Sequence, residues 1–131
     1  MGEGCPWDLW PQIPVGDKFD RSKLWCSKSK ITDAGGTTAV GKYGISPYGV
    51  TDMAGNVWQW CADWYDTNFW TSRQSEGADP QNQSAGEQKY RVLRGGSWSY
   101  FDPVNFRAAF RVKGAPGTRS GTDGFRGASR P

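Results

Sequence analysis

The sequence predicts a single, loop-rich domain built on short β-strands. The chain has 131 residues, which suits one domain able to bury roughly two-thirds of its unfolded surface. Its 18 glycines and 8 prolines favour many turns over helical packing. Aromatic residues make up 15% of the chain and include eight tryptophans. Because each ring buries a large area, a few of them can fill a small core.

The N-terminal third is expected to be mostly irregular. Residues 1–30 contain three prolines that interrupt regular structure, and residues 32–47 are rich in small polar residues. Within the second segment, residues 38–43 are predicted to form a short strand, followed by a turn at 48–53. Three tryptophans would need a cover from a neighbour or from oligomerisation: Trp7, Trp10 and Trp25.

Alternating hydrophobic patterns predict the later strands. The polar stretch 66–88 is expected to be a long surface loop, and residues 112–123 a second loop rich in Gly, Ser and Thr. In the segment 105–111, Phe106, Ala108 and Phe110 would share one face, so Phe106 and Phe110 are candidates for the core. The predicted strands are 56–60, 90–98 and 105–111, with 124–126 closing the sheet.

The charge of the chain is uneven. Residues 1–90 carry 8 Lys and Arg against 11 Asp and Glu, while residues 91–131 carry 8 against 2. The basic residues of the second part stand singly rather than in a stripe, so a nucleic-acid partner is not expected. No apolar run approaches the ~20 residues of a membrane-spanning helix.

The cysteine count is odd and the chain has no histidine. Cys5, Cys26 and Cys61 include no Cys-x-x-Cys pair, so a zinc site is not expected. A disulfide between Cys5 and Cys26 stays open for an oxidising compartment. Cys61 lies among tryptophans and is expected to be a buried small residue.

Two segments carry the most specific pattern. Gly55-Asn-Val-Trp-Gln-Trp60 is followed by Arg94-Gly-Gly-Ser-Trp98, Arg107-Ala-Ala-Phe-Arg111 and Gly124-Phe-Arg126. Over about residues 38–126 this order and spacing resembles the sulfatase-modifying-factor family, which includes formylglycine-generating enzyme. The resemblance assigns a structural role to Gly55, Asn56, Trp58, Trp60, Gly95, Gly96, Trp98, Arg107, Arg111, Phe125 and Arg126. Trp98 and Phe125 would be aromatic anchors, and the arginines would pin loop ends.

The resemblance implies an α+β, C-type-lectin-like fold with short antiparallel strands over residues 1–131. It also implies a test for catalysis. The enzymes of the family oxidise a substrate cysteine with two active-site cysteines that bind copper and follow the Gly-Gly-Ser-Trp motif. The corresponding loop, residues 99–105, contains no cysteine, and the related non-haem-iron branch needs histidine ligands. We therefore expect no enzymatic activity. The alternative is a diverged, inactive member of the copper-dependent oxidase branch.

No cofactor is expected. Family members often carry structural calcium near the Gly-Asn-x-Trp-Glu-Trp segment, where this chain has Gln59 in place of the glutamate. Loss of a carboxylate weakens a site for a hard cation, although Asn56 and backbone carbonyls keep structural calcium open.

A second resemblance suggests a function. Variable proteins of diversity-generating retroelements share this fold and motif set, and their diversified positions surround the same motifs in a C-terminal region, here 99–123. The ligand-binding residues that this resemblance implies are Ser99, Tyr100, Phe101, Asp102, Phe110, Val112, Lys113, Gly114, Ala115, Gly117, Thr118, Ser120, Gly121, Thr122 and Asp123. Mutation of adenines in Asn codons cannot yield Lys, so Lys113 alone departs from the residue types expected there.

Tyr, Ser and Gly on loops are typical of a protein-binding surface, with Tyr100 and Phe101 as the candidate hot spots. The sequence thus predicts a hypervariable, non-enzymatic protein that binds a protein or cell-surface ligand. A purely structural subunit, with its tryptophans against a partner, is the remaining alternative. If an upstream targeting segment has been removed, display on a cell surface or a phage virion is expected.

Overall fold

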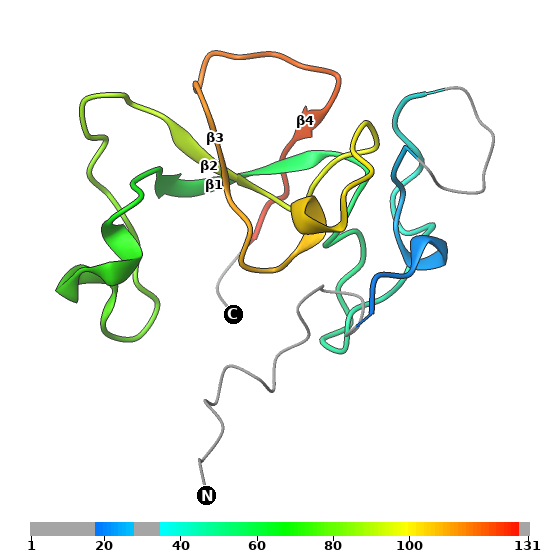
Figure 1. Cartoon of the computed structure of the whole chain (residues 1–131), viewed down its shortest axis with the longest axis horizontal. Helices are drawn as coiled ribbons and strands as arrows, with labels where there is room; N and C mark the ends of the chain where they lie inside the picture. The colour runs from blue at the N-terminus through cyan, green and yellow to red at the C-terminus, as the bar shows by residue number, and fades with distance from the viewer. Residues whose placement is uncertain (1–17, 28–34, 129–131) are drawn as a thin grey trace, which may run out of the picture.

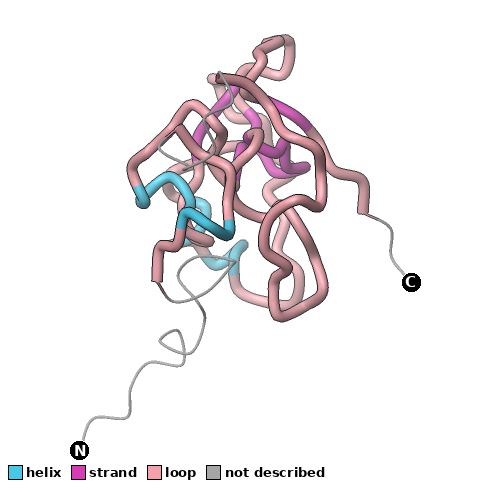
Figure 2. Tube along the Cα trace, turned by 90° about the vertical axis from the view of Figure 1, so that its right-hand side faces the viewer, coloured by secondary structure: helices cyan, strands magenta, loops and turns pink. Residues whose placement is uncertain are grey.

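The structure is a computed structural model that describes residues 18–27 and 35–128. Within these two ranges the regular elements are four short strands and four 3-10 helices, and loops connect them over most of the chain (Figure 2). The expected loop-rich character is therefore confirmed. The helical part of the expected α+β class is limited, in the described ranges, to single 3-10 turns.

The sheet is small and mixed. Its strands are β1 (Trp58–Trp64), β2 (Arg91–Arg94), β3 (Val112–Gly114) and β4 (Asp123–Gly124), in the order β3-β2-β1-β4 (Figure 1). The β1–β2 and β2–β3 pairs are antiparallel, whereas β4 runs parallel to β1. The expectation of antiparallel strands alone was wrong. The loop 115–122 carries the chain over the sheet from one edge to the other, so β4 arrives in the same direction as β1.

The strands at 56–60 and 90–98 were predicted in the right places with the wrong ends. Strand β1 starts only at Trp58, because Asn56 has a φ of 64° that no extended strand adopts, and it then continues to Trp64. Strand β2 ends at Arg94, because Gly95 and Gly96 follow with φ of 93° and 76°.

Two strand predictions were wrong. The predicted strand 38–43 is a turn, in which Gly41 has a φ of 76° and donates its N–H to Asp52 Oδ2 at 2.6 Å. The predicted strand 105–111 begins instead with the 3-10 helix η5 (Pro103–Phe106) and a further turn. The Asp102 carboxylate caps η5 by accepting from Val104 N at 3.0 Å, and a proline in the first turn favours the helix start.

A side-chain cap also starts the first described 3-10 helix, whereas the two helices between residues 69 and 75 have none. Helix η2 (Arg21–Lys23) follows Asp20, whose carboxylate accepts from Ser22 N. In the expected loop 66–88 lie η3 (Phe69–Thr71) and η4 (Arg73–Ser75), which form a lobe at one end of the molecule in Figure 1. Most of this segment is exposed, as expected, but Phe69 is buried. The expected loop 112–123 contains β3 and the start of β4.

The two sequence motifs, residues 55–60 and 94–98, lie against each other at a close crossing and are joined by backbone hydrogen bonds. Gly55 N donates to Gly95 O at 2.7 Å, and Trp98 N donates to Asn56 O at 2.8 Å. On the other side, Asn56 N donates to Trp25 O at 2.9 Å, and Trp25 forms a parallel bridge with Gly55. A Cβ atom at Gly55 would lie 2.5 Å from Trp25 O. Three chain segments can meet here only because glycine leaves room for the backbones.

The core lies beside this crossing. Leu24, Cys26, Ala54 and Phe106 form a buried cluster, and the half-buried Phe19 stacks on Phe106 with ring centroids 5.7 Å apart. The prediction of Phe106 as a core residue is confirmed, whereas Phe110 is only half-buried.

Some expectations concern residues outside the described ranges. Cys5, Trp7 and Trp10 lie there, so the Cys5–Cys26 disulfide and the cover of these two tryptophans stay predictions. Trp25 is buried and donates its Nε1–H to Gly36 O at 2.7 Å. Among the described residues, no helix has the length and apolar character needed to cross a membrane.

We expect Gly55→Ala to destabilise the fold more than Gly41→Ala. Both glycines have similar positive φ, 80° and 76°, so both substitutions carry backbone strain of about 1–2 kcal/mol. Only at Gly55 does the new Cβ meet backbone atoms, which adds about 1–3 kcal/mol of overpacking. Urea denaturation of the two variants measures the difference, and equal losses of stability would contradict the close crossing.

Candidate ligand-binding face

Tyr100 and Phe101 lie in the loop that follows the Gly-Gly-Ser-Trp motif. Tyr100 keeps 41% of its surface exposed and Phe101 keeps 54%. The start of the loop is held at Tyr100, whose N–H donates to Ser97 O at 3.1 Å and whose carbonyl accepts from Ser27 N at 3.0 Å. The two exposed rings are therefore presented on a backbone with defined partners.

Trp58, at the start of β1, connects several of the predicted ligand-binding residues. It is buried, and its ring meets Tyr100 edge-on with centroids 5.5 Å apart and Phe110 at 6.3 Å. Its backbone N–H donates to Thr122 O at 2.7 Å. Three predicted positions from separate segments thus converge on one buried tryptophan.

The loop 115–122 is attached to the same region. Trp98 Nε1 donates to Gly121 O at 3.1 Å, and the hydroxyls of Ser120 and Thr122 lie 2.8 Å apart. We call the residues around Trp58 and Trp98 the loop face. The predicted residues that contact or pair with Trp58 or Trp98 are Tyr100, Phe110, Gly121, Thr122 and Asp123. We include in the loop face their predicted neighbours along the chain: Ser99, Phe101, Asp102 and Ser120.

The predicted positions on β3 lie elsewhere. The ammonium of Lys113 lies 5.1 Å from the ring centroid of Tyr90 and 6.0 Å from that of Tyr65, and it donates to Gln88 at 3.1 Å. Gly114 packs against the sheet, where a Cβ would lie 2.7 Å from Trp60 Cη2. Val112 is paired with Leu93. The remaining predicted positions are exposed in the loop 115–122, which we call the arching loop: Ala115, Gly117 and Thr118.

Three of the four motif arginines donate to backbone carbonyls: Arg94 to Ala108 O, Arg111 to Ala109 O at 2.7 Å, and Arg126 to Thr51 O at 2.5 Å. The fourth, Arg107, makes no side-chain hydrogen bond to another described residue, so its expected role in holding a loop end is not found. The expectation for Phe125 was wrong, because its ring is 86% exposed. Phe125 follows the two-residue strand β4, where the neighbouring Gly124 packs against Val57.

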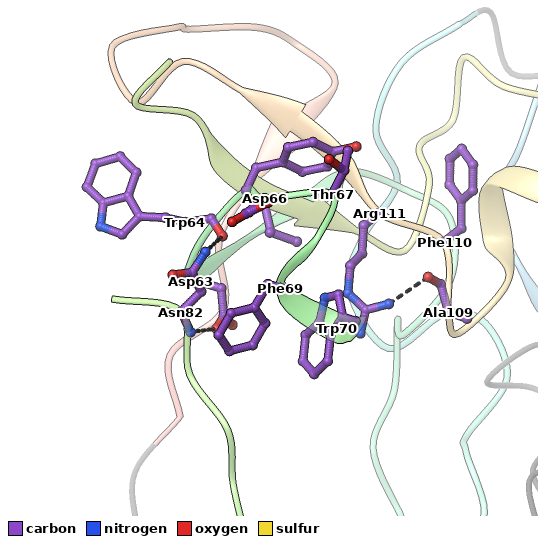
Figure 3. A pocket seen from close by; sticks show the side chains of 12 residues that line it. Asp63, Trp64, Asp66, Thr67, Phe69, Trp70, Asn82, Ala109, Phe110 and Arg111 are labelled. Atoms are coloured by element: carbon purple, nitrogen blue, oxygen red, sulfur yellow. Dashed lines mark hydrogen bonds between the residues drawn. The ribbon is translucent and has the colours of Figure 1, made fainter. Parts of the chain in front are cut away.

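A hollow beside η3 was not predicted. It has a volume of about 280 Å³ and lies beside the 3-10 helix η3, between residues 63–70 and the chain at 109–111 (Figure 3). The Arg111 guanidinium lies over the Trp70 ring, 4.5 Å from its centroid. Burial, followed by repulsion from Arg94, lowers the pKa of Arg111. The adjacent aromatic pair Phe69-Trp70 in an otherwise polar segment was the available sequence signal.

The side chains near Gln59 do not fit a calcium site. The Asn56 amide is occupied on both sides, accepting from Thr38 N at 3.0 Å and donating to Thr38 O at 3.1 Å. Gln59 Nε2 donates to Asp52 O at 2.6 Å, and its neutral amide is a weaker ligand for a hard cation than the carboxylate of glutamate. The described residues include no group of three or more His, Cys, Asp or Glu side chains placed to hold a metal ion.

The chain is similar to a variable protein, to bacterial protein kinases and to formylglycine-generating enzymes. Among solved structures, variable protein 1 of Treponema denticola superposes with a TM-score of 0.60 at 30% identity, covering 80% of this chain and 35% of that one. The serine/threonine-protein kinase pkn1 of Chlamydia caviae is 40% identical over 115 residues, which is 88% of this chain and 17% of the kinase.

Formylglycine-generating enzymes also match. The enzyme of Thermomonospora curvata is 33% identical over 85% of this chain and 39% of its own length. The inactive Cα-formylglycine-generating enzyme 2 of Bos taurus is 33% identical over 90% of this chain and 38% of its own. The chain therefore spans well under half of these curated relatives. The sulfatase-modifying factor enzyme 1-like domain matches residues 12–131. The chain belongs to the sulfatase-modifying factor enzyme 1-like family and resembles the variable proteins of diversity-generating retroelements.

Proposed function

We propose that this chain is a non-enzymatic, C-type-lectin-like domain that binds a protein or cell-surface ligand through the loop face. The observation that carries the proposal is the pair of exposed rings, Tyr100 and Phe101, on a loop tied to the frame. The similarity to a variable protein supports it.

The chemistry of the loop face suits protein recognition. Aromatic side chains contribute large contact areas and lose little rotamer freedom on binding, and small polar residues around them adapt their hydrogen bonds. Tyr100 already packs on Trp58, so part of the entropy cost of ordering its ring is met before a ligand arrives. The rings of Tyr100 and Phe101 are the expected hot spots.

We also propose that a diversity-generating retroelement varies the residues at the loop positions. Gly117 and Gly121 have open space where a Cβ would lie, so other residues fit at these positions without displacing the frame. Gly114 has no such space, because Trp60 and Leu93 occupy it. We therefore infer that Gly114 belongs to the frame and that the variable set lies in the loops around it.

Catalysis is not proposed for this chain. Formylglycine formation needs a cysteine pair after the Gly-Gly-Ser-Trp motif, and no cysteine follows Cys61. Kinase activity is not carried over from the pkn1 relatives, because the chain has no histidine for a His-Arg-Asp motif and no Asp-Phe-Gly triplet. Burial raises the pKa of the Cys61 thiol, so it is not a thiolate at neutral pH.

The loop face is tested by the double variant Tyr100→Ala, Phe101→Ala. Its affinity for a partner captured by the wild-type chain should fall about 30-fold or more, as expected when hot-spot rings are removed. Phe125→Ala is the control, since it removes a ring outside the loop face that is 86% exposed. Isothermal titration calorimetry reports both affinities. An unchanged affinity in the double variant would refute the proposed face.

The state of Cys61 gives a separate prediction. Its alkylation rate by iodoacetamide should reach half its maximum above pH 9.0, the ordinary thiol value, because burial disfavours the charged thiolate. Peptide mass spectrometry after timed quenching isolates this residue from the other cysteines. Rapid alkylation at neutral pH would show a reactive thiolate and reopen the question of catalysis.

A further inference from the structure

Three arginines converge on a pocket that is separate from the hollow beside η3 and that the proposed function does not use. The pocket has a volume of about 220 Å³, and Arg94, Arg107 and Arg126 contribute to its wall. They come from β2, from the turn after η5 and from the segment after β4. None of the fifteen predicted ligand-binding residues lines it. We call it the arginine pocket.

The positive charge of the arginine pocket is not balanced within the described part of the chain. Its lining contains no Asp or Glu, and no described carboxylate forms an ion pair with any of the three guanidinium groups. Three cations held around a small space create a positive potential that favours an anion. Repulsion from Arg94 also contributes to the lowered pKa of the nearby Arg111.

The three guanidinium groups differ in how far they are engaged. Arg94 donates to Ala108 O, and Arg126 donates to Thr51 O and to Met53 Sδ. These bonds orient both side chains without neutralising them. Arg107 makes no side-chain hydrogen bond to another described residue, and it is exposed. Its planar fork of N–H groups is therefore available for a carboxylate, which it can bind through two parallel bonds.

The rest of the wall is largely apolar. Met53, Trp60 and Ala108 line the pocket beside the arginines, and the Cys61 thiol stays neutral because burial raises its pKa. A short aliphatic stem could contact these side chains while its charged end meets Arg107. We propose that the arginine pocket binds the carboxylate of a glutamate or aspartate side chain from a protein partner.

The experiment follows the arginine Nε–Hε signals of the ¹⁵N-labelled chain during titration with N-acetyl-glutamate α-amide, whose one charge is the side-chain carboxylate. N-acetyl-glutamine α-amide is the neutral match, and ionic strength is held constant with chloride. We expect saturable shifts for the glutamate derivative only. The dissociation constant should rise about tenfold or more in Arg107→Gln, which loses charge-assisted hydrogen bonds.

Arg119→Gln is the matched control, since Arg119 is an exposed arginine outside the pocket and its loss should leave the titration unchanged. Equal effects of the two variants, equal shifts with the neutral amide, or no saturation by on the order of 100 mM would overturn the proposal. Tighter binding of inorganic phosphate than of the glutamate derivative would overturn the carboxylate assignment. The Tyr100→Ala, Phe101→Ala variant should keep these shifts, so the two proposals fail separately.

Discussion

The close crossing of three backbones at Gly55 is the constraint on which the rest of the structure depends. Gly55 lies between Trp25 and Gly95, within hydrogen-bonding distance of Gly95 O and with no room for a side chain. Through Asn56 the same crossing connects to Trp98. Because these contacts join segments far apart in sequence, they hold a domain in which regular elements are short.

This crossing places the loop face on a rigid support. Trp58 lies two residues after Asn56, and Tyr100 and Phe110 pack against its ring. Trp98 follows two residues after Gly96 and holds the arching loop at Gly121. Each motif therefore does two things: its glycines allow the crossing, and its tryptophans support the loops above. Side chains at the loop positions can differ while these supports stay the same, which suits a binding protein with a variable surface.

The sequence predicted the parts of the fold that depend on local pattern and composition. The loop-rich class followed from composition and the burial of Phe106 from periodicity. The family motifs predicted carbonyl contacts for four arginines, of which Arg94, Arg111 and Arg126 make them. The alternation of Phe106, Ala108 and Phe110 imitates a strand, so it predicts the wrong element here. Asp102 and Pro103 are the local signal for the start of η5. The parallel direction of β4 depends on the path of the arching loop, which no local pattern encodes.

The candidate site was predictable only where it depends on the spacing of the motifs. The motif spacing located Tyr100 and Phe101, because loops that follow a structural motif tend to be exposed. It could not reveal that Gly114 packs under Trp60, or that Lys113 belongs to a different surface with Tyr90, since both depend on pairing across the sheet. The arginine pocket could not be predicted from the sequence. Arg94, Arg107 and Arg126 are distant along the chain, and only the fold places them in the wall of one pocket.

The division between a constant frame and variable loops is tested most directly by deep sequencing of codons 91–131 across a growing source population. We predict that variation is concentrated at the codons of the loop face and at those of Gly117 and Thr118. The flanking DNA should contain a near-copy of this region, and that copy should be rich in Asn codons. The codons of Gly95, Gly96, Trp98 and Gly114 should stay constant. Variation at Gly114 equal to that at Gly117 would contradict the frame, and an invariant region would contradict a diversified binding surface.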